Sequence, residues 1–314
     1  MIEGHDLELF QRSLRVATGQ HSGEALDAAL TELGWGDALS FDTRAAVSCL
    51  FEAQGEACAS SSALDLVVVH ALGLELDGAT SVVLPAIGEW APPAQPSGAR
   101  VAVRGLLTVS RPSVLVVAAD GAEATAAFVD ASALELRPVH GLDPWLALVE
   151  AHGAVDRPDG VAVDWTAAVT LAQLALAHEL VGASRTALRL AREHALERIQ
   201  FGQPIAMFQA VRHRLAEALV AIETASAVIG AAWLDRSPVT AAMAKATAGR
   251  SARTAAQHCQ QVLAGVGFTT EHDLHRSVRR IFVLEQLFGS HAALTKRLGE
   301  DLLSTRALPR LLPL

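Results

Sequence analysis

The chain has 314 residues, a formal net charge of −9 and 51% hydrophobic residues, so it can bury a sizeable core. The acidic balance disfavours a nucleic-acid surface, because phosphate binding depends on clustered Lys and Arg. Three cysteines without metal-ligand spacing, no uncharged apolar run of roughly 18 residues and no signal-peptide pattern favour a soluble, cytoplasmic protein without a membrane span.

Residues 1–77 have the pattern of an N-terminal helical domain. The stretches LELFQRSLRVA and LDAALTELGW repeat apolar residues every three or four positions. Gly and Ser breaks separate them, so we expect several short helices.

Residues 78–155 change in character and predict a small β domain. Short Val-rich stretches such as VVLPAI, ARVAVRGLLTV and SVLVVAA alternate with Pro, Gly and Asp turns. This pattern is typical of antiparallel strands.

Residues 156–314 return to a long helical period. We expect helices at about 164–198, 205–234, 238–264 and 272–303, joined by short connections. Long antiparallel helices of this kind form an up-and-down four-helix bundle. The fold class is therefore mainly α with a small β domain, in the order helices, sheet and bundle.

One corner within the bundle, ERIQFGQPIAMFQ at 197–209, carries polar and aromatic residues where the helix is interrupted. Arg198 can bind a phosphate through paired donors, Gln200 and Gln209 supply amide donors, and Phe201 offers an aromatic face. The alternative is an ordinary helix hairpin, with Phe201 in the core and a glycine at the helix end.

Two blocks resemble the C-terminal bundle of the acyl-CoA dehydrogenase family. ELVGASRTALRLAREHALERIQFGQPIAMFQAVRHRLAE (179–217) is similar to the family's R-x-Q-F-G-x-P-I followed by F-Q-x-V-x-H-x-L-A. QVLAGVGFTTEHDLHRSVRR (261–280) resembles Q-x-x-G-G-x-G-(F/Y)-T-x-E-x-x-x-x-R-x-x-R. The order of helices, β domain and bundle also agrees with the family.

The resemblance implies FAD as a cofactor shared across a subunit interface. In the family, the bundle of one subunit holds the ADP half of the flavin whose ring lies in its neighbour. Carried over to this sequence, the residues implicated are Arg198, Gln200, Phe201, Gln209, Gln261 and Gly265. One position departs from the family: the first glycine of G-G-x-G is Ala264, whose methyl group would narrow the approach to a ligand.

Two segments that hold the flavin ring in the family, T-E-x-x-x-G-S and W-(I/V)-(T/S)-N, have no counterpart in the β domain. The family's catalytic base is a Glu placed nine residues after a bundle arginine, in a Y-E-G-T segment. Counting from Arg276 reaches Glu285, but in the context VLEQLFGS. Glu285 is therefore either the base or a charge on a helix face of a chain without its own flavin site.

Other polar clusters allow less specific interpretations. Glu271, His272, Asp273 and His275 match no standard metal-site spacing, so we expect no metal. The arginines at 276, 279 and 280 form a basic patch, which is either a solvated or interface face or an anion-binding surface.

The sequence resembles the shortened partner subunit of an actinobacterial α2β2 acyl-CoA dehydrogenase, and this resemblance implies the steroid-catabolism type. Such a subunit would complete the FAD site of a full-length dehydrogenase chain, which binds most of the acyl-CoA. Two alternatives remain: a self-sufficient homotetrameric dehydrogenase with Glu285 as base, and a non-catalytic bundle protein.

Overall fold

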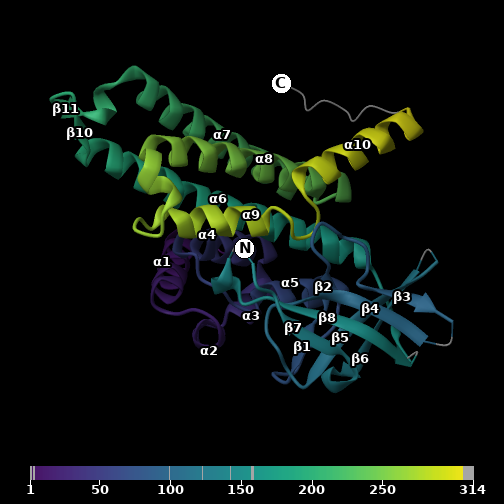
Figure 1. Ribbon diagram of the computed structural model, residues 1–314. Helices are drawn as coiled ribbons and strands as arrows, with labels where there is room; N and C mark the ends of the chain where they lie inside the picture. Colours follow the sequence, from purple (N-terminus) through teal and green to yellow (C-terminus); the bar gives the residue numbers. More distant parts are fainter. Residues whose placement is uncertain are drawn as a thin grey trace.

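The computed structural model describes Ile2 and residues 4–98, 100–121, 123–141, 143–156 and 159–306. Five N-terminal helices come first: α1 (Gly4–Gln20), α2 (Glu24–Glu32), α3 (Trp35–Phe41), α4 (Thr43–Ala57) and α5 (Ala63–Leu72). A sheet follows, and a long helical bundle covers the N-terminal helices (Figure 1). The last residues of the expected bundle domain, 307–314, lie outside the described residues.

The N-terminal helices join the bundle through a close crossing of α4 with α6 (Trp165–Glu197). Gly55 and Gly182 face the opposite backbone there. A Cβ at Gly55 would lie 2.1 Å from the Glu179 carbonyl oxygen, and one at Gly182 would lie 2.1 Å from that of Glu52. The two backbones approach this closely because neither glycine carries a side chain.

The sheet contains β1 (Thr80–Val82), β2 (Leu84–Pro85), β3 (Ala94–Ser97), β4 (Arg100–Leu107), β5 (Ser113–Asp120), β6 (Glu123–Asp130), β7 (Glu135–Pro138), β8 (Val149–Asp156) and β9 (Val161–Val163). Most pairs are antiparallel, as expected, with the order β7-β8-β4-β3-β5-β6-β9. The pairs β1–β5 and β3–β5 are parallel. The last strand, β9, lies beyond residue 155, where the composition places the end of the β domain.

Both faces of the central strand β5 are buried, which explains its unbroken apolar sequence. Val114 and Val116 pack into a cluster made of sheet residues. Leu115 and Val117 point the other way, into the main core shared with the helices. Alternating side chains therefore join the sheet to the helical layer through one face.

The bundle consists of α6, α7 (Gln209–Asp235) and α8 (Pro238–Leu263), followed by two shorter helices. The single fourth helix expected at 272–303 is wrong. The chain forms α9 (Leu274–Leu284), breaks, and resumes as α10 (His291–Thr305), which projects beyond the bundle (Figure 1). At the break Phe288 and Gly289 have φ of 53° and 97°, and the Ser290 hydroxyl caps α10 by accepting from the Ala293 N–H.

Two helices, α6 and α7, are long and apolar enough to cross a membrane by length and composition alone. In α6, 83% of the apolar window is buried, as in the central helix of a bundle. In α7 the figure is only 28%. Much of the outward face of α7 is therefore apolar and uncovered by the part of the chain that the structure describes.

Candidate functional site

The turn between α6 and α7 is a β-hairpin at the end of the bundle away from the sheet (Figure 1). Strands β10 (Ile199–Gln200) and β11 (Gln203–Pro204) pair antiparallel, and α6 ends at its C-cap, Arg198. The turn residues Phe201 and Gly202 have φ of 53° and 80°. Two positive φ angles define the tight turn that matches the twist of a hairpin, and asparagine or glycine usually occupies both positions.

Phe201 is 92% exposed, so the alternative interpretation that places it in the core is wrong. Its ring contacts Phe208 edge-on, at 6.0 Å between centroids. A bulky residue with positive φ is a genuine backbone outlier. The chain therefore holds an aromatic ring in solvent on a strained turn, an arrangement that clusters at ligand clamps.

The second sequence block meets the first at this end of the bundle. The His272 ring, just before α9, lies edge-on to His194 in the last turns of α6, with 5.9 Å between centroids. Gln261 is on the last turn of α8, and Gly265 is in the short helix η4 (Ala264–Phe268) that follows. Six residues were assigned to the flavin from sequence, and all are exposed here: Arg198, Gln200, Phe201, Gln209, Gln261 and Gly265.

Charge and shape at this end suit an anionic, partly aromatic ligand. Arg198 forms no ion pair with any described residue, and Arg212 on the first turns of α7 is also exposed. A Cβ on Gly265 would meet nothing within 4 Å, so the space beside its backbone is open. Apolar side chains surround these groups without cover: Leu196, Ile199, Met207 and Phe268. These residues therefore fit the adenosine diphosphate half of a flavin and a covering protein surface.

Ala264 has a backbone conformation that glycine adopts freely and alanine does not. Its φ is 52° and its ψ −131°, at the point where α8 turns into η4. Alanine in place of the motif's glycine therefore strains the backbone at residue 264, in addition to any effect on a ligand. Gly267, by contrast, is required by packing, because a Cβ there would lie 2.8 Å from the Gln260 carbonyl oxygen.

Replacing Ala264 with glycine is expected to raise the free energy of unfolding by roughly 1 kcal/mol, because the left-handed strain disappears. The same change at exposed, helical Ala216 in α7 should lower it by about 1 kcal/mol. Urea denaturation of both variants measures the effects. A loss of stability in both would contradict the strain at Ala264.

Glu285 lies away from this end, at the α9–α10 break, and its side chain is buried. Its carboxylate accepts hydrogen bonds from the His291 backbone N–H at 2.7 Å and from the Gln286 amide at 2.6 Å. The pKa of Glu285 is lowered: burial acts to raise it, but the hydrogen bonds from His291 and the nearby charge of Lys245 together outweigh that effect. The carboxylate thus caps α10, which favours the helix-charge interpretation, although the group is buried rather than solvated.

The family's base motif also aligns with this chain from a different arginine. Nine residues after Arg279 stands Phe288, followed by Gly289-Ser290 in the place of Gly-Thr. Phe288 is 1% exposed and its ring stacks on Trp165 with 6.3 Å between centroids. The two counts therefore reach different residues, a buried glutamate that accepts from the His291 N–H and a buried phenylalanine, and the role of Glu285 as base stays a prediction.

The junction between sheet and bundle around this corner is filled. The Trp165 indole N–H donates to the Trp90 carbonyl at 2.9 Å, and Gly88 donates to the Gln286 carbonyl. A Cβ on Gly289 would lie 2.9 Å from the Trp90 ring. These contacts pack the sheet against the bundle where the α9–α10 break lies.

The sequence did not predict that two cationic side chains, those of Lys245 and Arg280, are buried. Lys245 on α8 is fully buried and donates to the Glu285 and Gly289 carbonyls at 3.0 and 3.2 Å; burial lowers its pKa to about 7. Arg280 was expected in a surface patch, but its side chain is buried and pairs with Asp143 and Glu179. Neither was recognisable locally, because their acceptors lie far along the chain.

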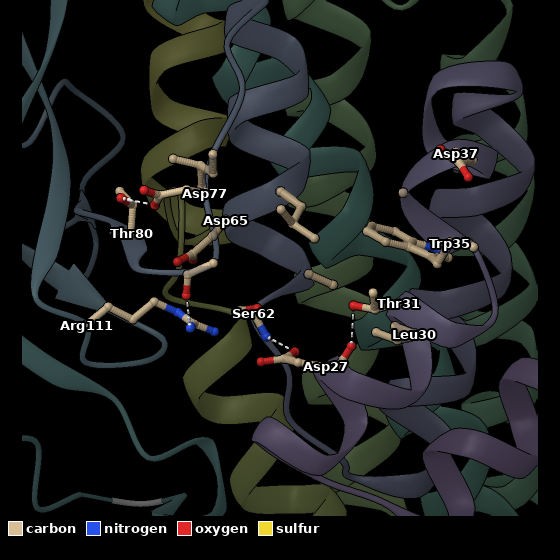
Figure 2. A pocket seen from close by; sticks show the side chains of 16 residues that line it. Asp27, Leu30, Thr31, Trp35, Asp37, Ser62, Asp65, Asp77, Thr80 and Arg111 are labelled. Atoms are coloured by element: carbon tan, nitrogen blue, oxygen red, sulfur yellow. Dashed lines mark hydrogen bonds between the residues drawn. The ribbon is translucent and has the colours of Figure 1, made fainter.

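A cavity of about 340 Å³ lies elsewhere, between α2, α3, α5 and β1 (Figure 2). Asp27, Asp65, Asp77 and Arg111 line it. Burial raises the pKa of Asp65 to about 7, while its carboxylate accepts from the Val82 N–H and the Thr108 hydroxyl. These bonds join α5 to the sheet. None of the residues predicted from sequence for the flavin or for catalysis lines this cavity.

Residues 159–303 match the family described as the C-terminal domain of acyl-CoA dehydrogenase. Acyl-CoA dehydrogenase IpdE2 of Mycobacterium tuberculosis is 36% identical over 165 residues, which cover 52% of this chain and 51% of that protein. IpdE2 of Mycolicibacterium smegmatis is 32% identical over 130 residues, 41% of this chain and 42% of that protein. The matches thus span about half or less of these relatives.

Solved structures share the fold over nearly the whole chain. One is a variant of the Tcur3481–Tcur3483 steroid acyl-CoA dehydrogenase, with a TM-score of 0.79 and 22% identity, covering 97% of this chain and 99% of that one. A chain of the ChsE4–ChsE5 complex from Mycobacterium tuberculosis has a TM-score of 0.75 and 19% identity, with 98% and 99% covered. At this identity the likeness establishes the fold.

Proposed function

We propose, from the premise that residues 159–303 belong to the acyl-CoA dehydrogenase family, that this chain is one subunit of a heteromeric, FAD-dependent acyl-CoA dehydrogenase. Its role is to complete the ADP half of a flavin site whose ring lies in a full-length partner chain. The partner binds the acyl-CoA and supplies the base that removes the α-proton. FAD supplies the acceptor for the β-hydride, and the product is the α,β-unsaturated thioester.

The observation that carries this proposal is the separation of the two half-sites. The end of the bundle exposes Arg198 and Phe201 to solvent, where only another chain can bring the rest of a flavin. At the junction of this chain's own sheet and bundle, Trp90, Trp165 and Phe288 occupy the space instead. A chain that exposes its ADP-binding residues and packs side chains at its own sheet–bundle junction would complete the flavin site of another subunit.

The residues at the bundle end have distinct tasks in this arrangement. Arg198 binds the diphosphate through its guanidinium, and Gln200, Gln209 and Gln261 offer amide donors around it. The ring of Phe201 packs against the adenine, and the open backbone at Gly265 allows close approach. Further along α7 the exposed apolar residues Leu219, Val220 and Leu234 support a protein partner on this helix.

Two solved complexes with this fold, Tcur3481–Tcur3483 and ChsE4–ChsE5, are named as pairs, which supports a second, different subunit. We propose that the assembly is α2β2, with one flavin for each pair of chains. The first is named as a steroid enzyme, which supports a steroid-derived CoA thioester as substrate. We further propose that the assembly is cytoplasmic.

Arg198→Ala in the purified assembly is expected to lower FAD affinity by roughly ten- to a hundredfold, because a charged hydrogen bond to phosphate contributes about 1.5–3 kcal/mol. Flavin absorbance per assembly after dialysis measures the occupancy. Arg236→Ala, in the α7–α8 turn, is the matched control and should leave it unchanged. Full occupancy in the Arg198 variant, or a yellow, active homo-oligomer of this chain alone, would refute the proposed role.

A further inference from the structure

A second basic site lies on the flank of the bundle, around Trp145. This residue belongs to the short helix η2 (Pro144–Leu146), between β7 and β8. The guanidinium carbon of Arg276 lies 5.4 Å from the centroid of its ring, and that of Arg279 lies 6.0 Å from it. The His275 ring lies 5.6 Å away. One tryptophan therefore positions two guanidinium groups on successive turns of α9.

The adjacent Arg280 has ion-pair partners in this part of the fold. It pairs with Asp143 at 2.5 Å and with Glu179 at 3.0 Å. Arg276 and Arg279, by contrast, form no ion pair with any described residue. The Nε of Arg276 is moreover buried without a hydrogen-bond acceptor in the described part of the chain. A buried donor without an acceptor costs about 1–3 kcal/mol, so an acceptor from another molecule would stabilise this site.

The geometry points to a phosphate group as that partner. Guanidinium forks match phosphate oxygens with paired donors, and two of them held side by side can bind one phosphate or diphosphate. Trp145 has guanidinium groups against its ring, so it positions the arginines rather than stacking on a base. The chain as a whole carries a net charge of −9, so this local positive charge is not part of a general basic surface.

We propose that Arg276 and Arg279, held by Trp145, bind a phosphate group of a nucleotide. The site goes beyond the proposed flavin contacts, because it contains none of their residues. Two nucleotide sources share this chemistry: a CoA thioester, with a diphosphate and a 3′-phosphate, and FAD, with a diphosphate only. Binding of inorganic phosphate but of none of the nucleotides would contradict a nucleotide site.

Calorimetric titration of the full chain with CoA, dephospho-CoA, FAD and inorganic phosphate tests the site. Arg276→Gln/Arg279→Gln is expected to weaken binding of the preferred probe at least about tenfold, and salt should weaken wild-type binding. Arg253→Gln is the matched control, because Arg253 also lies over an aromatic ring, 4.9 Å from the Phe282 centroid, but outside the cluster. It should bind like the wild type.

If binding is detected, the comparison of probes identifies which phosphate group is bound. Weaker binding of dephospho-CoA than of CoA assigns the 3′-phosphate, and equal binding assigns the diphosphate. The proposal is overturned if no probe binds the wild-type chain, or if the double variant binds every probe unchanged. A melting curve confirms that the variants fold. Arg198→Ala should leave binding at this site intact, so its outcome stands apart from that of the proposed function.

Discussion

Arg280→Met is expected to lower the free energy of unfolding by about 3–5 kcal/mol at neutral pH, because it leaves two buried carboxylates without their cation. The guanidinium bonds Asp143 at 2.5 Å, Glu179 at 3.0 Å and the Cys58 carbonyl at 3.0 Å. These acceptors come from three separate parts of the chain. Loss of the arginine therefore loosens the N-terminal helices, the β7–β8 connection and α6 together.

The stability of the Arg280→Met variant should also depend on pH in a definite direction. Burial already raises the pKa of Glu179 above its usual value, and Arg280 is the main group opposing this. Without the arginine the folded-state pKa rises further above the unfolded value. The folded variant then binds more protons than the unfolded chain, so its stability should fall as the pH rises from about 4 towards 7.

Urea denaturation between pH 4 and pH 8 measures both effects. Arg279→Met is the control, because Arg279 is half-buried over Trp145 and forms no ion pair with a described residue. It should change stability by less than about 1 kcal/mol. Equal stability of the Arg280 variant and the wild type at pH 7 would show that the buried cluster contributes nothing net.

Gly182→Ala is expected to destabilise the protein by roughly 3 kcal/mol or more, because its methyl group would overlap the α4 backbone. The Cβ would lie 2.1 Å from the Glu52 carbonyl oxygen and 3.0 Å from the Glu56 nitrogen. Both are main-chain atoms within a helix, so neither can turn aside as a flexible side chain would. The helices α4 and α6 would have to separate.

Gly230→Ala in α7 is the matched control for this change. A Cβ there meets nothing within 4 Å, and glycine within a helix is less stable than alanine by about 1 kcal/mol. The control should therefore raise the melting temperature, while Gly182→Ala lowers it or prevents folding. Two shifts of the same sign in thermal melts would contradict the close crossing.

The patterns that sequence reasoning used well were periodic and local. Apolar spacing placed α6, α7 and α8 within a few residues of their observed bounds, and the Val-rich stretches became the sheet. The single helix expected at 272–303 is wrong because Phe288-Gly289-Ser290 interrupts the helical period. Gly289 and the capping Ser290 were the available signals of a break.

At the candidate site, too, local motifs were predicted from the sequence and tertiary contacts were not. The motif identified six residues from two blocks, and the structure brings these blocks together through His194 and His272. The role of Glu285 was ambiguous because counting along a motif depends on which arginine starts the count. Burial and the hydrogen bond from the His291 backbone favour a capping role, and only tertiary contacts carry that information.

The sequence by itself determined the mainly helical class and the position of the sheet between two helical parts. These properties depend on composition and short-range periodicity. The residues at the α6–α7 turn that could hold an anionic, aromatic ligand came from a family resemblance and stay a prediction. Only the tertiary structure decided that Phe201 is exposed on a strained hairpin, that Phe288 stacks on Trp165, and that Arg280 is buried in ion pairs while the Arg276 Nε has no acceptor among the described residues. The reason is physical: exposure, packing and ion pairing depend on partners that lie up to hundreds of residues away, such as Cys58 for Arg280.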